Sequence, residues 1–257
     1  RMAEAISRYQ PHSEVHIFVD TGMNREGVKL ADLPQFLVDL SKFNLNITGL
    51  MSHLAIGGAP KHPLTRKQLR EFNIAIRICK KAGLKLRWIH LGGSNAILHT
   101  RHRSFNLVRV GLALYGIDPM GHNNHLKPVL SLKTKIALIK KIQKGESVGY
   151  NAKFTAKKDM TIGILPIGYN DGVDRRLSAK GVVTVAYQTC PILGYASMNM
   201  TTIDLSKVEN PYVGGEVVVF STNPDDLNSI QTAAKIAQTT PYDLLVHLVS
   251  STRREII

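Results

Sequence analysis

The 257-residue sequence has few cysteines and no long hydrophobic segment. It contains two cysteines, Cys79 and Cys190, which lie far apart and outside any C-x-x-C spacing. We therefore expect reduced core residues and neither a disulfide framework nor a cysteine metal site. No apolar run approaches the length that spans a bilayer, and the first residues lack a signal-peptide pattern. These absences predict a soluble, cytoplasmic protein without membrane contact.

Acidic residues are also scarce, because 33 lysines and arginines face 19 aspartates and glutamates, for a formal net charge of +14. Such a charge can indicate nucleic-acid binding. However, the basic residues are spread over expected helix faces ("RKQLREF", "IRICKKAG") and strand edges ("KTKIALIKKIQK"). No RNA-binding signature, zinc finger or basic strip interleaved with aromatics accompanies them. The sequence favours a basic surface that attracts anionic small molecules over a nucleic-acid partner.

Residues 1–128 show an alternation of strand and helix patterns. Strands are expected over 14–20, 46–53, 85–93 and 106–111, and helices over 31–43, 65–83 (with Thr65 as N-cap) and 94–102. This alternation is typical of βα units on a parallel sheet. The units amount to about half of a (β/α)₈ barrel, and half a barrel leaves an open sheet edge. Together with the non-methionine start at Arg1, this suggests that an N-terminal part is missing.

After a polar linker over 121–129 the pattern changes to short strands separated by glycine turns. Residues 129–257 therefore predict a β-rich C-terminal domain, with one or two helices near the end, the first capped around 223–226. The predicted fold class is α/β plus all-β, namely the C-terminal half of a (β/α)₈ TIM-type barrel followed by a β domain.

The expected strand ends of the first domain carry an unusual set of polar residues. Arg109 lies within the apolar, β-rich run "NLVRVG", although arginine is almost never buried unless it is paired. The other strand-end positions are Arg25, His53, His90, Ser94 and Gly111. Cations and small residues at the carboxyl ends of barrel strands suit a phosphorylated ligand. The simpler alternatives are a strand-end ion pair for Arg109 and a hydrogen-bonded core histidine for His53.

Several longer motifs make the prediction more specific. They are "VHIFVDTGMNREGV", "GLMSHLA", "HLGGSNAIL", "FNLVRVGLALYGIDP", "GESVGYNAKFTA", "ILPIGYNDGVDRRL" and "ILGYASMNMTTIDL". In order and spacing these motifs resemble those of the alanine racemases along essentially the whole chain. The resemblance implies pyridoxal 5'-phosphate (PLP) as cofactor, an N-terminal barrel, a C-terminal β domain and interconversion of L- and D-alanine.

The resemblance also implies roles for the barrel residues. Arg109 would point its permanently charged guanidinium at the pyridine nitrogen of PLP, with His90 holding it from behind. Ser94 and the backbone around Gly111 and Leu112 would cradle the phosphate. Arg25 would bond the phenolic oxygen of the cofactor, close to the substrate carboxylate.

Three residues of the β domain resemble family residues that complete the site. Tyr150 corresponds to the catalytic tyrosine, one of two bases on opposite faces of the substrate Cα, with His53 as a helper. Tyr169 and Met198 match residues at the entrance and substrate pocket. In the family this tyrosine reaches the barrel of the partner subunit, so the resemblance implies a homodimer with composite sites.

The sequence departs from the family pattern at several positions. No segment resembles the K-A-N-A-Y-G-H-G-like motif with the Schiff-base lysine, and Lys29 and Lys153 are surface-like candidates that do not replace it. We expect these 257 residues alone to be inactive. The smaller departures are Phe18 at a position where some relatives carry a modifiable lysine, Gly93 for an asparagine, Asn199 for a carboxylate and Ser250 for a tyrosine.

Three other functions remain open from the residues alone. The protein could racemise another amino acid, because part of the substrate pocket lies in the lysine segment. It could be a non-catalytic PLP-binding barrel, although such proteins lack the second domain that carries Tyr150. It could be a barrel-plus-β decarboxylase, but those usually place an acidic residue opposite the pyridine nitrogen, where this sequence has Arg109.

Overall fold

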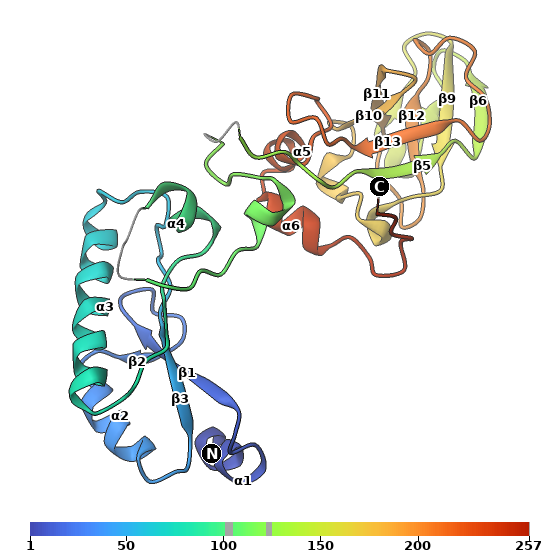
Figure 1. Ribbon diagram of the computed structural model, residues 1–257. Helices are drawn as coiled ribbons and strands as arrows, with labels where there is room; N and C mark the ends of the chain where they lie inside the picture. The colour runs from blue at the N-terminus through green and yellow to red at the C-terminus, as the bar shows by residue number, and fades with distance from the viewer. Residues whose placement is uncertain (101–104, 122–124, 257) are drawn as a thin grey trace. The chain divides into compact units, whose positions relative to one another are not determined.

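The computed structural model describes residues 1–100, 105–121 and 125–256. The chain divides into two compact units (Figure 1): unit 1 comprises 1–114 and 118–124, and unit 2 comprises 115–117 and 125–257. Within the described residues, no helix is both long enough and apolar enough to cross a membrane.

Unit 1 contains a four-stranded parallel sheet in the order β2-β1-β3-β4. Its elements are α1 (Met2–Tyr9), β1 (Glu14–Asp20), β2 (Val28–Lys29), α2 (Leu33–Leu40), β3 (Asn46–Met51), α3 (Pro63–Lys81), β4 (Trp88–His90), α4 (Ser94–His99) and the short 3₁₀ helix η1 (Leu112–Tyr115). The strands β1, β3 and β4 lie side by side in the sheet, and α2 and α3 cover the same side of it (Figure 1). This one-sided arrangement is typical of a barrel wall and differs from a doubly wound sheet.

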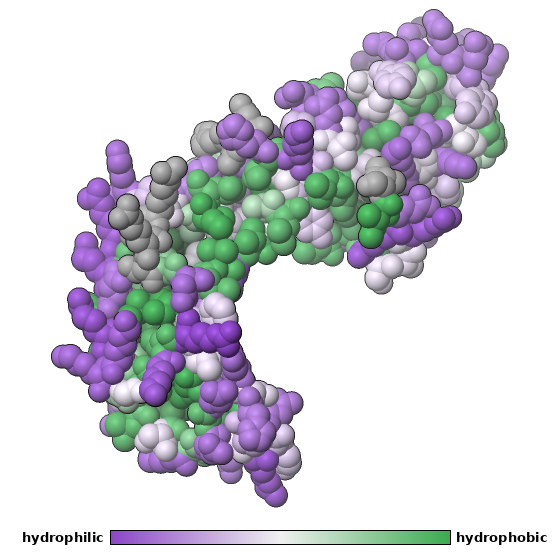
Figure 2. Space-filling view, viewed as in Figure 1, coloured by the Kyte–Doolittle hydropathy of each residue, from purple (hydrophilic) through white to green (hydrophobic). Residues whose placement is uncertain are grey.

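Helix α3 packs against the sheet through residues at helical spacing. It buries Thr65, Gln68, Leu69, Phe72, Ala75, Ile76 and Cys79. Phe72, at 0% exposure, joins Val19, Leu50 and Leu91 in the core of unit 1. Each side chain of this kind contributes about 1.5–3 kcal/mol when fully buried. The exposed face of α3 is basic, and Figure 2 shows hydrophilic side chains along this outer edge.

Two details of unit 1 differ from the sequence-based expectation. Thr65 is not the N-cap of α3: the helix begins after His62, whose Nδ1 accepts a hydrogen bond from the Leu64 amide at 3.2 Å, while the Thr65 hydroxyl donates to the Ile56 carbonyl. The predicted strand over 106–111 does not form either. The side chain of Asn106 accepts from the Ile89 amide of β4 and donates to the Arg87 carbonyl just before β4, so it takes the place of two backbone partners. The backbone bonds from the Asn106 amide to the Ile89 carbonyl and from the Arg109 amide to the Gly92 carbonyl are isolated and do not form a ladder.

Parts of two predictions lie outside the described residues. The predicted helix over 94–102 is observed as α4, and residues 101–102 of it are outside the described part of the chain. The same holds for residues 122–124 of the predicted linker.

Unit 2 is built on a seven-stranded antiparallel sheet in the order β5-β13-β10-β11-β12-β9-β6, with a separate hairpin of β7 and β8. Its strands are β5 (Leu132–Lys135), β6 (Leu138–Ile142), β7 (Ser147–Val148), β8 (Phe154–Thr155), β9 (Met160–Leu165), β10 (Val182–Val185), β11 (Gln188–Leu193), β12 (Thr201–Asp204) and β13 (Glu216–Phe220). Its helices are η2 (Tyr150–Ala152), η3 (Tyr169–Asp171), η4 (Arg175–Leu177), α5 (Ile230–Ile236) and α6 (Pro241–Val246). The predicted cap at 223–226 is wrong, because Ser229 caps α5 by accepting from the Thr232 amide.

Candidate functional site

The carboxyl ends of the parallel strands in unit 1 meet at one edge of the sheet. Phe18 of β1 is in register with Met51 of β3, and Met51 with His90 of β4. The segments that follow these strands therefore emerge side by side. Arg25 and His53 lie on two of them, and His90 is the last residue of β4. This is the edge at which barrel proteins place their ligands.

Arg109 is half-buried and is fixed by three contacts at this edge. Its Nη1 lies 2.6 Å from His90 Nδ1, and its Nη2 lies 2.8 Å from the Ser52 carbonyl and 3.0 Å from His53 Nδ1. Among the described residues these contacts engage three of the five N–H groups of the guanidinium. The Nε–H and one Nη1–H remain to bind an acceptor, so Arg109 is a charged donor held in a fixed position.

A hydrogen-bonded row connects Arg109 to His90 and His16. Because Arg109 can only donate, His90 Nδ1 accepts, and the remaining proton of the neutral ring lies on Nε2. His90 Nε2 then donates to His16 Nδ1 at 2.7 Å. The row crosses β3, which lies between β1 with His16 and β4 with His90. His16 is paired with Gly49 of β3, and a Cβ at position 49 would lie 2.3 Å from the His16 ring.

Burial and positive charge keep both histidines beside Arg109 neutral. His90 is 3% exposed, and burial, followed by the charge of Arg109, lowers its pKa to about 4. Burial also lowers the pKa of His53, with further contributions from Arg109 and Arg25. Neutral rings suit their observed role, because each accepts a hydrogen bond from the guanidinium.

A buried glutamine fixes the loop that carries His53. Gln68 of α3 is 0% exposed; its Nε2 donates to the His53 carbonyl at 2.8 Å and its Oε1 accepts from the Ala55 amide at 2.9 Å. The Thr21 and Ser52 hydroxyls, 2.9 Å apart, join the ends of β1 and β3 beside it. These contacts satisfy polar groups that would otherwise be buried without partners.

Arg25 belongs to an exposed turn after β1. The Asp20 carboxylate shapes this turn by accepting from the Gly22, Met23 and Asn24 amides at 2.9–3.1 Å. The Arg25 guanidinium pairs with the neighbouring carboxylate of Glu26, its Nη2 lying 2.6 Å from Oε1. The hydrogen bond from Arg25 lowers the pKa of Glu26, and the charges of Arg25 and Arg109 act in the same direction. Arg25 and Glu26 are therefore electrostatically part of the Arg109 site.

Ser94, Gly111 and Leu112 form a second group in unit 1. Ser94 is the first residue of α4, and its Oγ accepts hydrogen bonds from the Gly111 amide at 3.1 Å and the Ala113 amide at 3.2 Å. Leu112 lies between these amides at the start of η1. The Ser94 oxygen therefore uses both of its lone pairs, and its O–H remains as a donor. This donor lies where α4 and η1 begin.

Unit 2 brings Tyr169 and Met198 together through backbone hydrogen bonds. The Tyr169 amide donates to the Ser197 carbonyl at 3.0 Å, and the Asn170 amide donates to the Met198 carbonyl at 2.9 Å. Gly168 permits this approach, because a Cβ there would lie 2.2 Å from the Ser197 oxygen. The side chains of Tyr169 and Met198 are 43% and 54% exposed, so both can meet a ligand.

Tyr150 lies on an exposed turn of unit 2 and its side chain is 68% exposed. Gly149, Asn151 and Ala152 around it have φ angles of 72°, 57° and 44°. Left-handed backbone of this kind costs about 1 kcal/mol or more for a residue with a Cβ. The turn is thus strained at Asn151 and Ala152, the two residues after the tyrosine that the sequence predicts to be catalytic.

Sequence reasoning missed several residues that support these groups. His16, Ser52 and Gln68 hold Arg109 and His53, and Tyr195 contacts cations beside Tyr150. His16 and Gln68 lie in an expected strand and an expected helix, where a single polar residue carries no signal of a buried partner. Their roles become visible only in the folded chain, where His16 meets His90 and Gln68 meets the loop that carries His53.

Comparison with known proteins gives a consistent result. Residues 1–119 match the family model for the N-terminal domain of alanine racemase, and residues 129–256 match that for its C-terminal domain. A curated alanine racemase of Borreliella burgdorferi is 32% identical over 249 residues, which cover 94% of this chain and 65% of the relative.

Solved structures agree with this match. The alanine racemase of Bacillus anthracis with bound L-Ala-P has a TM-score of 0.85 at 30% identity, covering 96% of this chain and 65% of that one. The alanine racemase of Bartonella henselae with covalently bound pyridoxal phosphate has a TM-score of 0.82 at 29% identity, covering 95% and 66%. The chain therefore spans only part of its curated relatives: 65% of the length of the Borreliella burgdorferi enzyme and 63% of that of an alanine racemase from Sorangium cellulosum. The predicted fold class, part of a (β/α)₈ barrel followed by a β domain, is confirmed.

Proposed function

Because the chain belongs to the alanine racemase family along both of its units, we propose that the protein interconverts L-alanine and D-alanine with PLP as cofactor. The observation that carries this proposal is the Arg109 guanidinium, fixed by His90, His53 and Ser52 at the carboxyl edge of the parallel sheet. We further propose that the protein acts in the cytoplasm and that its product supplies D-alanine for peptidoglycan.

The donor set of unit 1 fits PLP, which presents a pyridine nitrogen at one end and a phosphate at another. The free N–H groups of Arg109 can donate to the pyridine nitrogen. The Ser94 hydroxyl and the Leu112 amide can donate to the phosphate, while the Gly111 and Ala113 amides hold the Ser94 side chain in place. When bound, PLP withdraws electrons from the Cα of the amino acid. The permanent charge of Arg109 keeps the pyridine nitrogen unprotonated and limits this withdrawal, which favours racemisation over transamination or decarboxylation.

The remaining site residues bind the substrate and move its proton. Arg25 orients the substrate carboxylate and the phenolic oxygen of the cofactor, with Glu26 fixing the guanidinium. Tyr150 removes or returns the Cα proton on one face, His53 assists it, and Tyr169 and Met198 line the entrance and pocket. Tyr150 acts in the site of the partner subunit, so the active form is a homodimer. The base on the opposite face is the family's lysine, whose motif does not occur in these 257 residues.

The test is a racemase assay on the complete gene product, with PLP and a panel of L-amino acids. The proposal predicts a protein with the absorbance of bound PLP that forms D-alanine faster than any other D-amino acid. The 257-residue polypeptide is the matched comparison and should form none. A complete product that binds PLP and racemises only serine or a basic amino acid would support the alternative racemase. One that binds PLP without any turnover would support the non-catalytic PLP-binding barrel.

A further inference from the structure

The turn that presents Tyr150 has little internal support. None of the three residues of η2 is buried, and Gly149 before it makes no side-chain cap. The return contact from the Lys153 amide to the Tyr150 carbonyl is long, at 3.4 Å. With left-handed backbone at Asn151 and Ala152, the turn needs contacts from elsewhere in unit 2 to keep one conformation.

Tyr195 supplies contacts to this turn and to a second one. The Lys153 Nζ lies 5.7 Å from the centroid of the Tyr195 ring, and the Arg175 Cζ lies 5.3 Å from the same centroid. Both distances are within the range of a cation–π interaction. Lys153 directly follows η2, and Arg175 begins η4, the short helix after η3 and Tyr169. One aromatic ring therefore contacts the residue directly after the Tyr150 turn and the first residue of η4, the short helix that follows the Tyr169 turn.

The backbone around Tyr195 reinforces the same connection. A Cβ on Gly194 would lie 2.8 Å from the Val148 carbonyl, so this backbone packs closely on the strand that leads into the Tyr150 turn. The Ser178 hydroxyl donates to the Arg175 carbonyl at 2.6 Å and accepts from the Ala196 amide at 3.0 Å. Tyr195 is thus held between the two turns by contacts on both of its sides in the sequence.

We propose that Tyr195 is a positioning residue, whose ring fixes the Tyr150 turn relative to Tyr169 by binding Lys153 and Arg175. Its consequence for catalysis rests on the proposed function, whereas its effect on the turn does not. The ring face is the acting group, so a phenylalanine should replace it and an aliphatic side chain should not.

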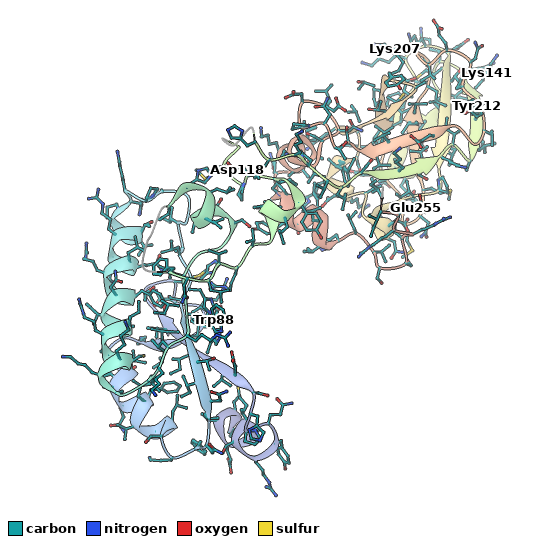
Figure 3. The ribbon with its side chains drawn as sticks, in the orientation of Figure 1. Trp88, Asp118, Lys141, Lys207, Tyr212 and Glu255 are labelled. Carbon is teal, nitrogen blue, oxygen red and sulfur yellow. The ribbon has the colours of Figure 1, made fainter. Side chains whose placement is uncertain are left out.

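Hydrogen exchange of the full chain tests the effect on the turn. In Tyr195→Leu, the amides of residues 150–153 should exchange about five- to thirtyfold faster, from the loss of two cation–π contacts. Tyr195→Phe should stay within about twofold of the parent, because it keeps the ring. Tyr212→Leu is the matched control: Tyr212 is 67% exposed and lies at the end of unit 2 opposite α6, so its loss should not alter these amides (Figure 3).

Unchanged exchange in Tyr195→Leu would overturn the proposal, and so would equally fast exchange in Tyr195→Phe. If Tyr195→Leu also loses protection in β9 and β12, Lys153→Gln replaces it, because Lys153 is exposed and removing its charge leaves the core intact. That variant should still speed exchange at 150–153, and an unchanged rate would overturn the proposal.

Kinetics of the complete gene product separate this proposal from the proposed function. Tyr195→Leu should lower kcat for L-alanine with little change in KM, and Tyr195→Phe should restore it. An inactive parent with the expected exchange result would refute the racemase function and leave the positioning role standing. An active parent whose Tyr195→Leu variant keeps the parental kcat would refute the catalytic consequence of the positioning role.

Discussion

Arg109 Nη1 and His90 Nδ1 lie 2.6 Å apart, in a pair where only the arginine can donate. The direction of this hydrogen bond determines the tautomer of His90. The ring proton of His90 lies on Nε2, from which it is donated to His16 Nδ1. A cation at the ligand edge is thus oriented by neutral groups behind it. In the described part of the chain no carboxylate contacts the Arg109 guanidinium directly, so its charge remains available to a bound ligand.

In the complete gene product, we expect Arg109→Glu to change the reaction as well as slow it. A carboxylate at this position would let the pyridine nitrogen be protonated, which strengthens electron withdrawal. Racemisation should fall about 100-fold or more, while the variant should gain transamination. Pyruvate formed from alanine, measured with lactate dehydrogenase, reports the side reaction, and Arg109→Lys is the control that keeps the charge. Parental racemisation without pyruvate in Arg109→Glu would refute the assigned role.

In the complete gene product, Tyr150→Phe should affect the two enantiomers differently. The phenol is the proposed base on one face of Cα, so its loss should abolish proton abstraction from L-alanine. Exchange of the α-proton of D-alanine with deuterated solvent should remain measurable, because it uses the other base. NMR of each enantiomer in deuterium oxide gives both rates. Equal loss for the two enantiomers would contradict the two-base assignment.

His90 should make the stability of the protein depend on pH between about 4 and 6.5. Its pKa is about 4 in the folded chain and near 6.5 when unfolded, so the unfolded state binds more protons in this window. The contribution of His90 is therefore complete above pH 6.5 and is lost as the pH falls toward 4, by up to about 3 kcal/mol. Urea unfolding at several pH values measures this loss.

His90→Gln should flatten that pH profile. The amide can still accept from Arg109 and donate to His16 but does not titrate, so the free energy of unfolding should fall less steeply below pH 6.5. His12→Gln changes an exposed histidine and should leave the profile as it is. A variant profile that parallels the parental one would show that other groups cause the acid sensitivity.

Gln68→Leu should destabilise unit 1 by about 2–4 kcal/mol, because the His53 carbonyl and the Ala55 amide would both lose their partner. The loop that carries His53 should loosen as well. Arg70→Gln, on the exposed face of the same helix, should stay within about 0.5 kcal/mol of the parent. Chemical unfolding gives both values, and equal midpoints for Gln68→Leu and the parent would contradict the role of Gln68.

The strands and helices were largely predictable because their side chains repeat with the period of the element. The pattern predicts β1 over its observed range and the N-cap of α3 to within three residues. The failures occur where one side chain replaces backbone pairing. Asn106, the first residue of the strand expected over 106–111, bonds the Ile89 amide and the Arg87 carbonyl with its side chain, and no ladder forms along β4. Ser229, rather than a residue of 223–226, caps α5.

The candidate site was predictable only as a set of strand ends. The sequence motifs mark Arg25, His53, His90 and Arg109, but they do not specify which of them touch. The ion pair between Arg25 and Glu26 is an example. The two residues are neighbours in sequence, and nothing in the motif shows whether their side chains bind each other or point separately into solvent. The contacts of Tyr195 likewise depend on two turns that are distant in sequence and meet only in the folded unit.

The hydrogen-bonded row over Gly49 limits how this fold can be recombined with that of other proteins. His16, Gly49 and His90 come from three strands that are neighbours in the sheet, β1, β3 and β4, and the glycine leaves the space in which the His16 ring lies. A chimaera that imports β3 with a larger residue at position 49 would displace His16 and remove the acceptor behind His90. The three strands therefore have to be exchanged together. A crossover point in a chimaera should be tolerated before β1 or after β4, but not between them.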